Sequence, residues 1–237
     1  MPYFELMGFG PRGWGAPMLL AAAMTIAVST TGFLLGTIFG ALGAAAKLSG
    51  SRVARIAADA YTTVLRGIPD LLVIYLLFFG GSAVVTWLGS QVFGSQGFIS
   101  VPAFAVGALA LGVCNGAYQA EVFRGGYLAL ARGEIEAGRA LGMAQATLFR
   151  RIIVPQVLRF AIPGLGNCWQ LCLKESALIT VTGLAELLRQ SQVGAGSTRQ
   201  PFFFYLTAGM LYLVITTVTS WLFDRAEKRA MRGFRRA

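Results

Sequence analysis

The sequence contains no histidine, and 13% of its 237 residues are charged, against about 25% in soluble globular proteins. Without histidine, the chain lacks the commonest acid–base catalyst and metal ligand at neutral pH. It has no HExxH zinc motif, and the aspartates at the entrance of one apolar segment, Asp59 and Asp70, have no matching pair elsewhere in the sequence. An enzymatic function, such as that of an intramembrane protease, is therefore disfavoured.

Cysteine is also scarce. The three cysteines, Cys114, Cys168 and Cys172, all lie in apolar segments. Cys168 and Cys172 share a helix face, but a structural zinc site needs four ligands, and the sequence offers no fourth thiol and no histidine. We therefore interpret all three as small residues of a packed core.

A phosphate-binding loop is missing as well. The three lysines are Lys47, Lys174 and Lys228, and none stands in the Gly-Lys-Ser/Thr context of such a loop. We therefore expect this chain to bind no cofactor itself. If its activity requires ATP and magnesium, another polypeptide must bind them.

Apolar residues are abundant and make up 56% of the chain. Because a membrane-spanning helix needs about 20 mostly apolar residues, the pattern predicts an all-α integral membrane protein, a single transmembrane domain over residues 1–237. Gly32, Gly36 and Gly40 form a stripe of small residues that allows close approach of another helix, from this chain or from a partner subunit. We expect five spans, at about 17–46, 68–88, 101–121, 160–183 and 201–223.

The lysines and arginines are unevenly distributed. Sixteen of the twenty lie in the 47–67 connection, in the 122–159 segment or in the tail after residue 223. By the positive-inside rule these segments face the cytoplasm, so the amino terminus lies outside and the carboxyl terminus is cytoplasmic. The net charge of +10 is then mainly topological, and we expect no nucleic-acid partner.

The 122–159 segment is polar although it lies between two apolar spans. Its GEIEAGRALGMAQATLFRRII stretch combines helix-forming residues with charges, and Gly142 interrupts it. Pro155 is expected to end this helical pattern, and Pro163 to mark the start of the next span. The sequence thus predicts two short helices with a bend, which either lie on the membrane surface or dock a cytoplasmic protein.

Within this segment, Glu136-Ala137-Gly138 is followed at fixed spacing by Gly142, Ile152 and Val154-Pro155. The spacing resembles the EAA loop of binding-protein-dependent ABC importer permeases, with Gly138 in place of a second alanine and Val154 in place of leucine. Three further stretches resemble the polar amino-acid uptake branch, nearest to histidine, lysine–arginine–ornithine and opine permeases: RGIPDLLVIYLLFFG (66–80), NGAYQAEVFRGG (115–126) and PGLGNCWQLCLKESALITVTGL (163–184).

The resemblance implies that residues 134–151 form coupling helices that seat in an ATPase subunit, with Glu136 as the charged contact and Gly142 at the bend. It implies a permease subunit of the bacterial cytoplasmic (inner) membrane that imports polar amino acids by ATP-driven alternating access. Asp70 directly follows Arg-Gly-Ile-Pro and favours basic substrates. The implied partners are a second permease subunit, identical or paralogous, two ATPase subunits, a periplasmic or extracellular amino-acid-binding protein and membrane lipid.

Ionisable groups at membrane depth cost about 2.5–3.5 kcal/mol each on insertion scales, so they mark functional or paired positions. An amino acid needs carboxylates for its ammonium group and any basic side chain, and donors for its carboxylate. A structural ion pair is the alternative for Glu121, near Arg124, and for Asp70, near Arg66. The candidates for the substrate path are the carboxylates Asp70, Glu121 and Glu175 and the amides Asn115, Gln119, Asn167 and Gln170.

A self-contained secondary carrier or channel is the main alternative function. Secondary carriers often consist of internal repeats, and the two halves of this sequence show none. Transport by the chain without an ATPase subunit would support the alternative.

Overall fold

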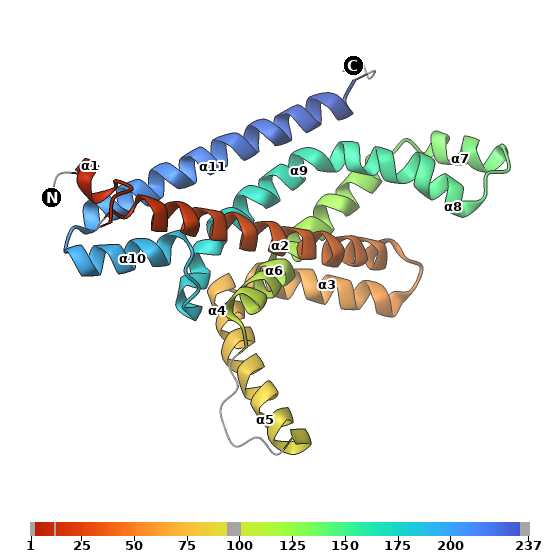
Figure 1. The fold of residues 1–237 in the computed structure, drawn as a ribbon. Helices are drawn as coiled ribbons and strands as arrows, with labels where there is room; N and C mark the ends of the chain where they lie inside the picture. The colour runs from red at the N-terminus through yellow and green to blue at the C-terminus, as the bar shows by residue number, and fades with distance from the viewer. Residues whose placement is uncertain (1–2, 12, 94–100, 233–237) are drawn as a thin grey trace.

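The computed structural model describes residues 3–11, 13–93 and 101–232, and these ranges are helical, with no strand (Figure 1). The elements are α1 (Tyr3–Leu6), α2 (Gly15–Leu48), α3 (Arg52–Gly67), α4 (Asp70–Tyr75), the π-helix η1 (Leu76–Gly80), α5 (Gly81–Phe93), α6 (Ala103–Leu128), α7 (Arg132–Ala140), α8 (Gln145–Leu148), the π-helix η2 (Phe149–Ile153), α9 (Val154–Glu175), the 3₁₀-helix η3 (Ser176–Thr182), α10 (Leu187–Thr198) and α11 (Pro201–Ala230).

Four helical stretches are long and apolar enough to cross a membrane. They correspond to the expected first, second, third and fifth spans, but the third continues to Leu128 and the fifth to Ala230. These helices extend past the apolar segments because residues such as Arg225 and Glu227 are good helix formers. The four stretches are Gly15–Leu48, Asp70–Leu88, Ala103–Leu128 and Pro201–Ala230.

The expected fourth span, 160–183, corresponds to α9, whose bounds differ and which is not among the four apolar stretches. Pro155 does not end a helix, and Pro163 lies inside α9 instead of before it. A proline lacks an N–H and its ring displaces the carbonyl group four residues earlier. The wide turn of η2, which contains that residue, Arg151, ends at Ile153, two residues before Pro155, and accommodates the proline.

The 47–67 connection contains a helix that the sequence analysis did not predict. Helix α3 begins after Ser51, whose hydroxyl accepts a hydrogen bond from the Ala54 N–H (3.3 Å). It packs against α2 and α6, and the Tyr61 hydroxyl donates to the Val113 carbonyl (2.7 Å). The helix ends just before Pro69, since a residue preceding proline is disfavoured in the helical conformation.

The core lies where α2 crosses α6, the most extensive contact between two helices of the described chain. The glycine stripe of α2 faces α6: a Cβ at Gly36 would lie 3.2 Å from the Gly116 nitrogen and 3.3 Å from the Gly112 carbonyl oxygen. The two backbones therefore meet directly. The stripe packs inside the chain, which leaves it no free surface for a partner subunit.

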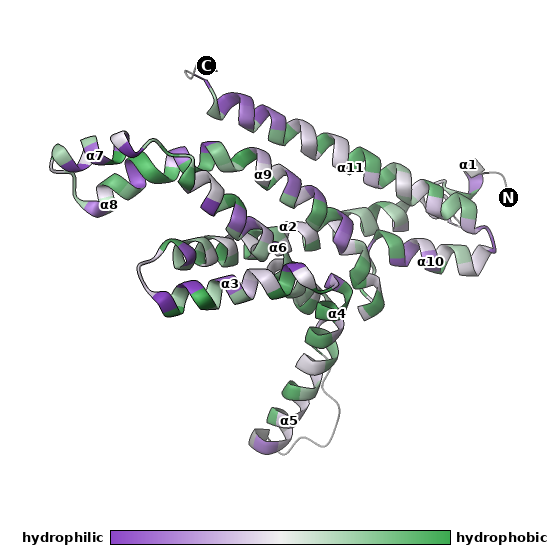
Figure 2. Cartoon of the chain, turned by 180° about the vertical axis from the view of Figure 1, so that it is seen from behind, coloured by the Kyte–Doolittle hydropathy of each residue, from purple (hydrophilic) through white to green (hydrophobic). Residues whose placement is uncertain are grey.

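One end of the molecule is formed by α7, α8 and the carboxyl end of α11 (Figure 1). Helices α7 and α8 project at one end, near the carboxyl end of α11, whereas the described N-terminal residues lie beside α10 at the other end (Figure 1). Hydrophilic residues gather on α7, on α8 and on the last turns of α11, and hydrophobic residues predominate on α5 (Figure 2). Helix α5 extends beyond the expected end of the second span, residue 88, as far as Phe93, and residues 94–100 fall outside the described residues.

Candidate functional site

Residues 132–153, comprising α7, a turn, α8 and η2, form a helical hairpin, named here the α7–α8 hairpin. Gly142 lies in the turn with a φ of 71°, in the left-handed region that glycine adopts without strain. The Met143 N–H donates to the Gly138 carbonyl (3.1 Å) and the Gly142 N–H to the Arg139 carbonyl (3.0 Å). This pair of hydrogen bonds is a Schellman motif, which ends α7 and satisfies its last carbonyl groups. The predicted bend at Gly142 therefore has a definite geometry.

The two arms of the hairpin pack against each other through small and apolar residues. Gly138 is buried, and a Cβ there would lie 2.5 Å from the Leu148 Cδ1 atom and 3.2 Å from the Ile152 Cδ1 atom. Leu148 itself is fully buried. The Glu134 carboxylate accepts a hydrogen bond from the Gln156 amide of α9. The hairpin is thus a packed unit that is joined to α9 both by chain continuity and by a side-chain contact.

The outer surface of the hairpin carries a different set of residues. Glu136 and Ala137 are exposed, as is Pro155 of α9 just beyond the hairpin. Two large apolar side chains of the hairpin also face outward, with exposed fractions of 82% for Leu141 and 55% for Phe149. Exposed apolar residues beside charged ones on a projecting element occur at protein-docking surfaces and at membrane-contact surfaces. The geometry therefore fits an element that contacts another polypeptide.

Asp70 and Glu175, named here the acidic pair, meet inside the molecule. Asp70 is the first residue of α4 and Glu175 the last of α9, and their carboxyl groups lie close to each other and to Cys114 of α6. Glu175 is 9% exposed, and its Oε2 atom is buried with no hydrogen-bond partner among the described residues. Two carboxylates this close repel unless a proton or a cation lies between them. The acidic pair can therefore hold a cationic group.

One side of the acidic pair is open. Asp70 and Tyr118 are partly exposed, whereas Arg66 is exposed and its guanidinium carbon lies 5.4 Å from the centre of the Tyr118 ring. Arg66 therefore makes a cation–π contact and forms no ion pair with a described residue. A polar ligand that reaches the pair would meet both a cation and an aromatic ring.

Asn115 and Gln119 do not lie in an open site. Both are fully buried. The Asn115 amide donates to the Cys168 carbonyl of α9 (2.8 Å), and the Gln119 amide donates to the Asn115 side-chain oxygen (2.8 Å). The Thr37 hydroxyl of α2 donates to the Gln119 side-chain oxygen (2.9 Å). These hydrogen bonds fasten α2, α6 and α9 together.

Glu121 is also held by other protein groups. Its carboxylate accepts from the Lys47 ammonium (2.5 Å) and from the Arg124 guanidinium (2.9 Å). Lys47 also pairs with Asp59 (2.9 Å), so the cluster joins α2, α3 and α6. The structure contains the ion pair that the sequence left open as the alternative role of Glu121.

Asn167 and Gln170 line a cavity between α9 and α11. The Gln170 amide donates to the Ser220 hydroxyl (2.6 Å), and its side-chain oxygen is buried without a partner among the described residues. Two carboxylates of α11, Asp224 and Glu227, also line this cavity. The sequence analysis placed them in the tail and missed them. Their spacing after Ser220, which puts all three on one helix face, was the available signal.

Comparison with known proteins places the chain in a family. Residues 32–232 match the family described as binding-protein-dependent transport system inner membrane component. The octopine transport system permease protein of Agrobacterium tumefaciens (strain Ach5) is 61% identical over 236 residues, which cover 100% of this chain and 99% of that protein. The nopaline transport system permease protein of Agrobacterium fabrum is 46% identical, with 97% and 98% covered. The histidine/lysine/arginine/ornithine transport system permease protein of Escherichia coli is 36% identical, with 95% and 98% covered.

Solved structures have the same fold. An amino acid ABC transporter with histidines superposes with a TM-score of 0.75 at 31% identity, covering 91% of this chain and 95% of that chain. A methionine ABC transporter in an inward-facing conformation superposes with a TM-score of 0.64 at 18% identity, covering 92% and 96%. A self-contained carrier is not favoured by these relatives. The chain therefore belongs to the binding-protein-dependent transport system inner membrane component family and is a permease component of an ABC importer, a transport subunit rather than an enzyme.

Proposed function

We propose that this permease imports basic amino acids or opines, with an octopine-class opine as the first candidate. The observation that carries the proposal is the acidic pair, because Asp70 and Glu175 offer two carboxyl groups to a cationic side chain or an ammonium group. The names of the relatives support it, since they cover octopine, nopaline, histidine, lysine, arginine and ornithine transport. Asn167 and Gln170 remain candidates for the substrate carboxylate, and Asp224 and Glu227 extend the path along α11.

We further propose five spans, with α9 as the fourth, an external amino terminus and a cytoplasmic carboxyl terminus. The α7–α8 hairpin and the end of α11 lie at one end of the molecule (Figure 1). They carry many of the basic residues, and the positive-inside rule assigns such an end to the cytoplasm of a bacterial inner membrane. The polar residues of α9 suit a span that faces other helices and a substrate path instead of lipid.

The proposed coupling element is the hairpin segment 134–151, which would seat in an ATPase subunit. Its exposed Glu136 and Leu141 supply contacts, and the packing around Gly138 passes movement to α9 through Ile152 and Pro155. The complete importer then contains a second permease subunit, two ATPase subunits that use ATP and magnesium, and an external binding protein. Alternating access occurs where the two permeases meet.

Uptake into proteoliposomes tests the substrate class. The transporter is reconstituted with its partners, and uptake of radiolabelled octopine, arginine, histidine and glutamate is measured with and without ATP. We expect ATP-dependent uptake of the solutes that have a basic side chain, octopine, arginine and histidine, reduced roughly 10- to 100-fold by Asp70→Asn or Glu175→Gln through loss of a charged hydrogen bond. Lys174→Gln is the matched control, because Lys174 adjoins Glu175 but is exposed. Preferential uptake of glutamate, or uptake by the chain without ATPase subunits, would contradict the proposal.

A further inference from the structure

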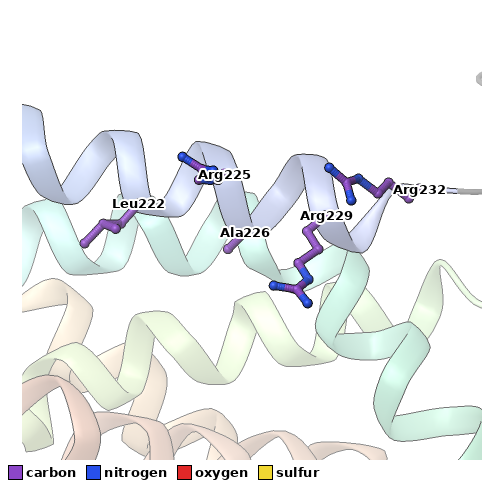
Figure 3. A pocket seen from close by; sticks show the side chains of 5 residues that line it. All are labelled: Leu222, Arg225, Ala226, Arg229 and Arg232. Carbon is purple, nitrogen blue, oxygen red and sulfur yellow. The ribbon is translucent and has the colours of Figure 1, made fainter.

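The last turns of α11 carry three arginines that line a shallow surface pocket (Figure 3). Arg225, Arg229 and Arg232 follow one another at intervals of four and three residues, so they lie along one side of the helix. Figure 3 shows their guanidinium groups spaced along these turns, with Leu222 and Ala226 completing the lining. Within the described chain, no carboxylate lines this pocket. We name these three arginines the basic face.

The basic face is not neutralised by the rest of the permease. None of its three arginines forms a salt bridge with a described residue, whereas Lys47 and Arg124 elsewhere in the chain do. The two acidic residues of the same turns, Asp224 and Glu227, line the separate cavity between α9 and α11. Three positive charges therefore stand together without a counter-charge among the described residues.

The basic face continues an apolar stripe along α11. Val214, Val218 and Leu222, spaced four residues apart, are 58%, 53% and 52% exposed, as expected for side chains that face lipid tails. Trp221 is 55% exposed, and the Arg225 guanidinium carbon lies 4.9 Å from the centre of its ring. Tryptophan is enriched at the membrane–water boundary. The order along the helix is therefore apolar, aromatic and cationic, which matches acyl chain, interface and headgroup.

We propose that the basic face binds the headgroup of an anionic phospholipid, with the acyl chains along Val214, Val218 and Leu222. Charge complementarity selects an anionic headgroup over a zwitterionic one, since the pocket offers three cations and no described carboxylate. Guanidinium groups suit a phosphate because they donate two parallel hydrogen bonds. The apolar stripe leads directly into the pocket, which favours a lipid over a soluble protein as the occupant.

Native mass spectrometry of the assembled transporter in detergent tests the proposal. The complex is titrated with dioleoyl phosphatidylglycerol or with dioleoyl phosphatidylcholine, which has the same acyl chains. A basic residue near an anionic headgroup strengthens binding about fivefold. We therefore expect about a hundredfold weaker phosphatidylglycerol binding in the triple variant Arg225→Gln, Arg229→Gln, Arg232→Gln. The corresponding triple lysine variant should retain part of the phosphatidylglycerol binding. Arg189→Gln is the control, because Arg189 is exposed on α10 at the opposite end (Figure 1).

Three results would overturn the proposal. One is equal binding of the two lipids by the wild-type transporter, and another is wild-type lipid binding by the triple glutamine variant. The third is loss of the ATPase subunit from that variant while lipid binding stays unchanged, which would assign the basic face to a protein partner. If the triple variant does not assemble, Arg229→Gln alone decides the question, with about fivefold weaker phosphatidylglycerol binding expected.

Discussion

Replacement of Gly142 tests the geometry of the α7–α8 hairpin, because the backbone there has a φ of 71°. A Cβ at this position would meet no atom within 4 Å, so the penalty for a side chain is conformational and not steric. A non-glycine residue in the left-handed conformation costs roughly 1–2 kcal/mol, or about 5- to 30-fold in the equilibrium between the closed and the opened turn. Asparagine tolerates this conformation better than alanine, and β-branched valine tolerates it least.

The assays are amide hydrogen exchange over residues 132–153 and substrate-stimulated ATPase activity of the reconstituted transporter. We expect exchange at the Met143 amide, which is bonded to the Gly138 carbonyl, to accelerate in the order glycine, asparagine, alanine, valine. ATPase stimulation should fall in the same order. Gly133→Ala is the matched control, because Gly133 lies in α7 with open space around it and no positive φ. A valine variant that exchanges like the wild type, or a control that loses as much stimulation, would refute the reasoning.

Three further predictions concern other parts of the chain. Gly36→Val should destabilise the detergent-purified protein by about 1–3 kcal/mol through overpacking, because the new Cβ would press on the α6 backbone. Gly209→Val is the control, since a Cβ at Gly209 meets no atom within 4 Å and should not destabilise the protein. Equal melting temperatures of the two variants would contradict the close packing of α2 against α6. Glu136→Lys should leave the complex assembled in the membrane but abolish ATPase stimulation, and normal coupled uptake would remove Glu136 from its proposed contact. Burial raises the pKa of Glu186, although its carboxylate accepts backbone N–H groups at the start of α10. Because the pKa of this carboxyl group is higher in the folded protein than in the unfolded chain, stability falls as pH rises from the unfolded-state pKa through the folded-state pKa. Melting temperatures should therefore decline from pH 5 to pH 8 more in the wild type than in Glu186→Gln. Parallel plots of melting temperature against pH for the two proteins would contradict this prediction.

The apolar runs predicted the four helical stretches that are long and apolar enough to cross a membrane, because length and hydropathy can be read directly from the sequence. Helix ends were less predictable. Pro155 and Pro163 normally interrupt helices, but here the wide η2 turn absorbs one and α9 continues through the other. The connection at 47–67 carries many charges, but its helix had local signals in the N-cap Ser51 and in apolar residues at helical spacing. Burial of Ala58 and Thr62 against other helices adds to these signals.

The candidate site was predictable only in part, because residue types can be read from the sequence but contacts between distant residues depend on the fold. Asp70 and Glu175 are far apart in sequence, and each was noticed as an ionisable residue of an apolar segment, but their meeting depends on the fold. Asn115, Gln119 and Asn167 all have side-chain amide groups. The amides of Asn115 and Gln119 form hydrogen bonds inside the helix bundle, whereas Asn167 lines a cavity. Residue type therefore indicates what a side chain can bind, and packing decides whether it is free to do so.

Labelling of the hairpin tip tests the central claim, that work from an ATPase enters this permease through the α7–α8 hairpin. Leu141→Cys places a thiol at a position that is 82% exposed, whereas the three native cysteines are buried. A membrane-impermeant maleimide is applied to right-side-out and to inverted vesicles, with and without the ATPase subunits. We predict labelling only in inverted vesicles, and protection when the ATPase subunits are present. Labelling from the external side, or labelling that the ATPase subunits do not change, would contradict the account.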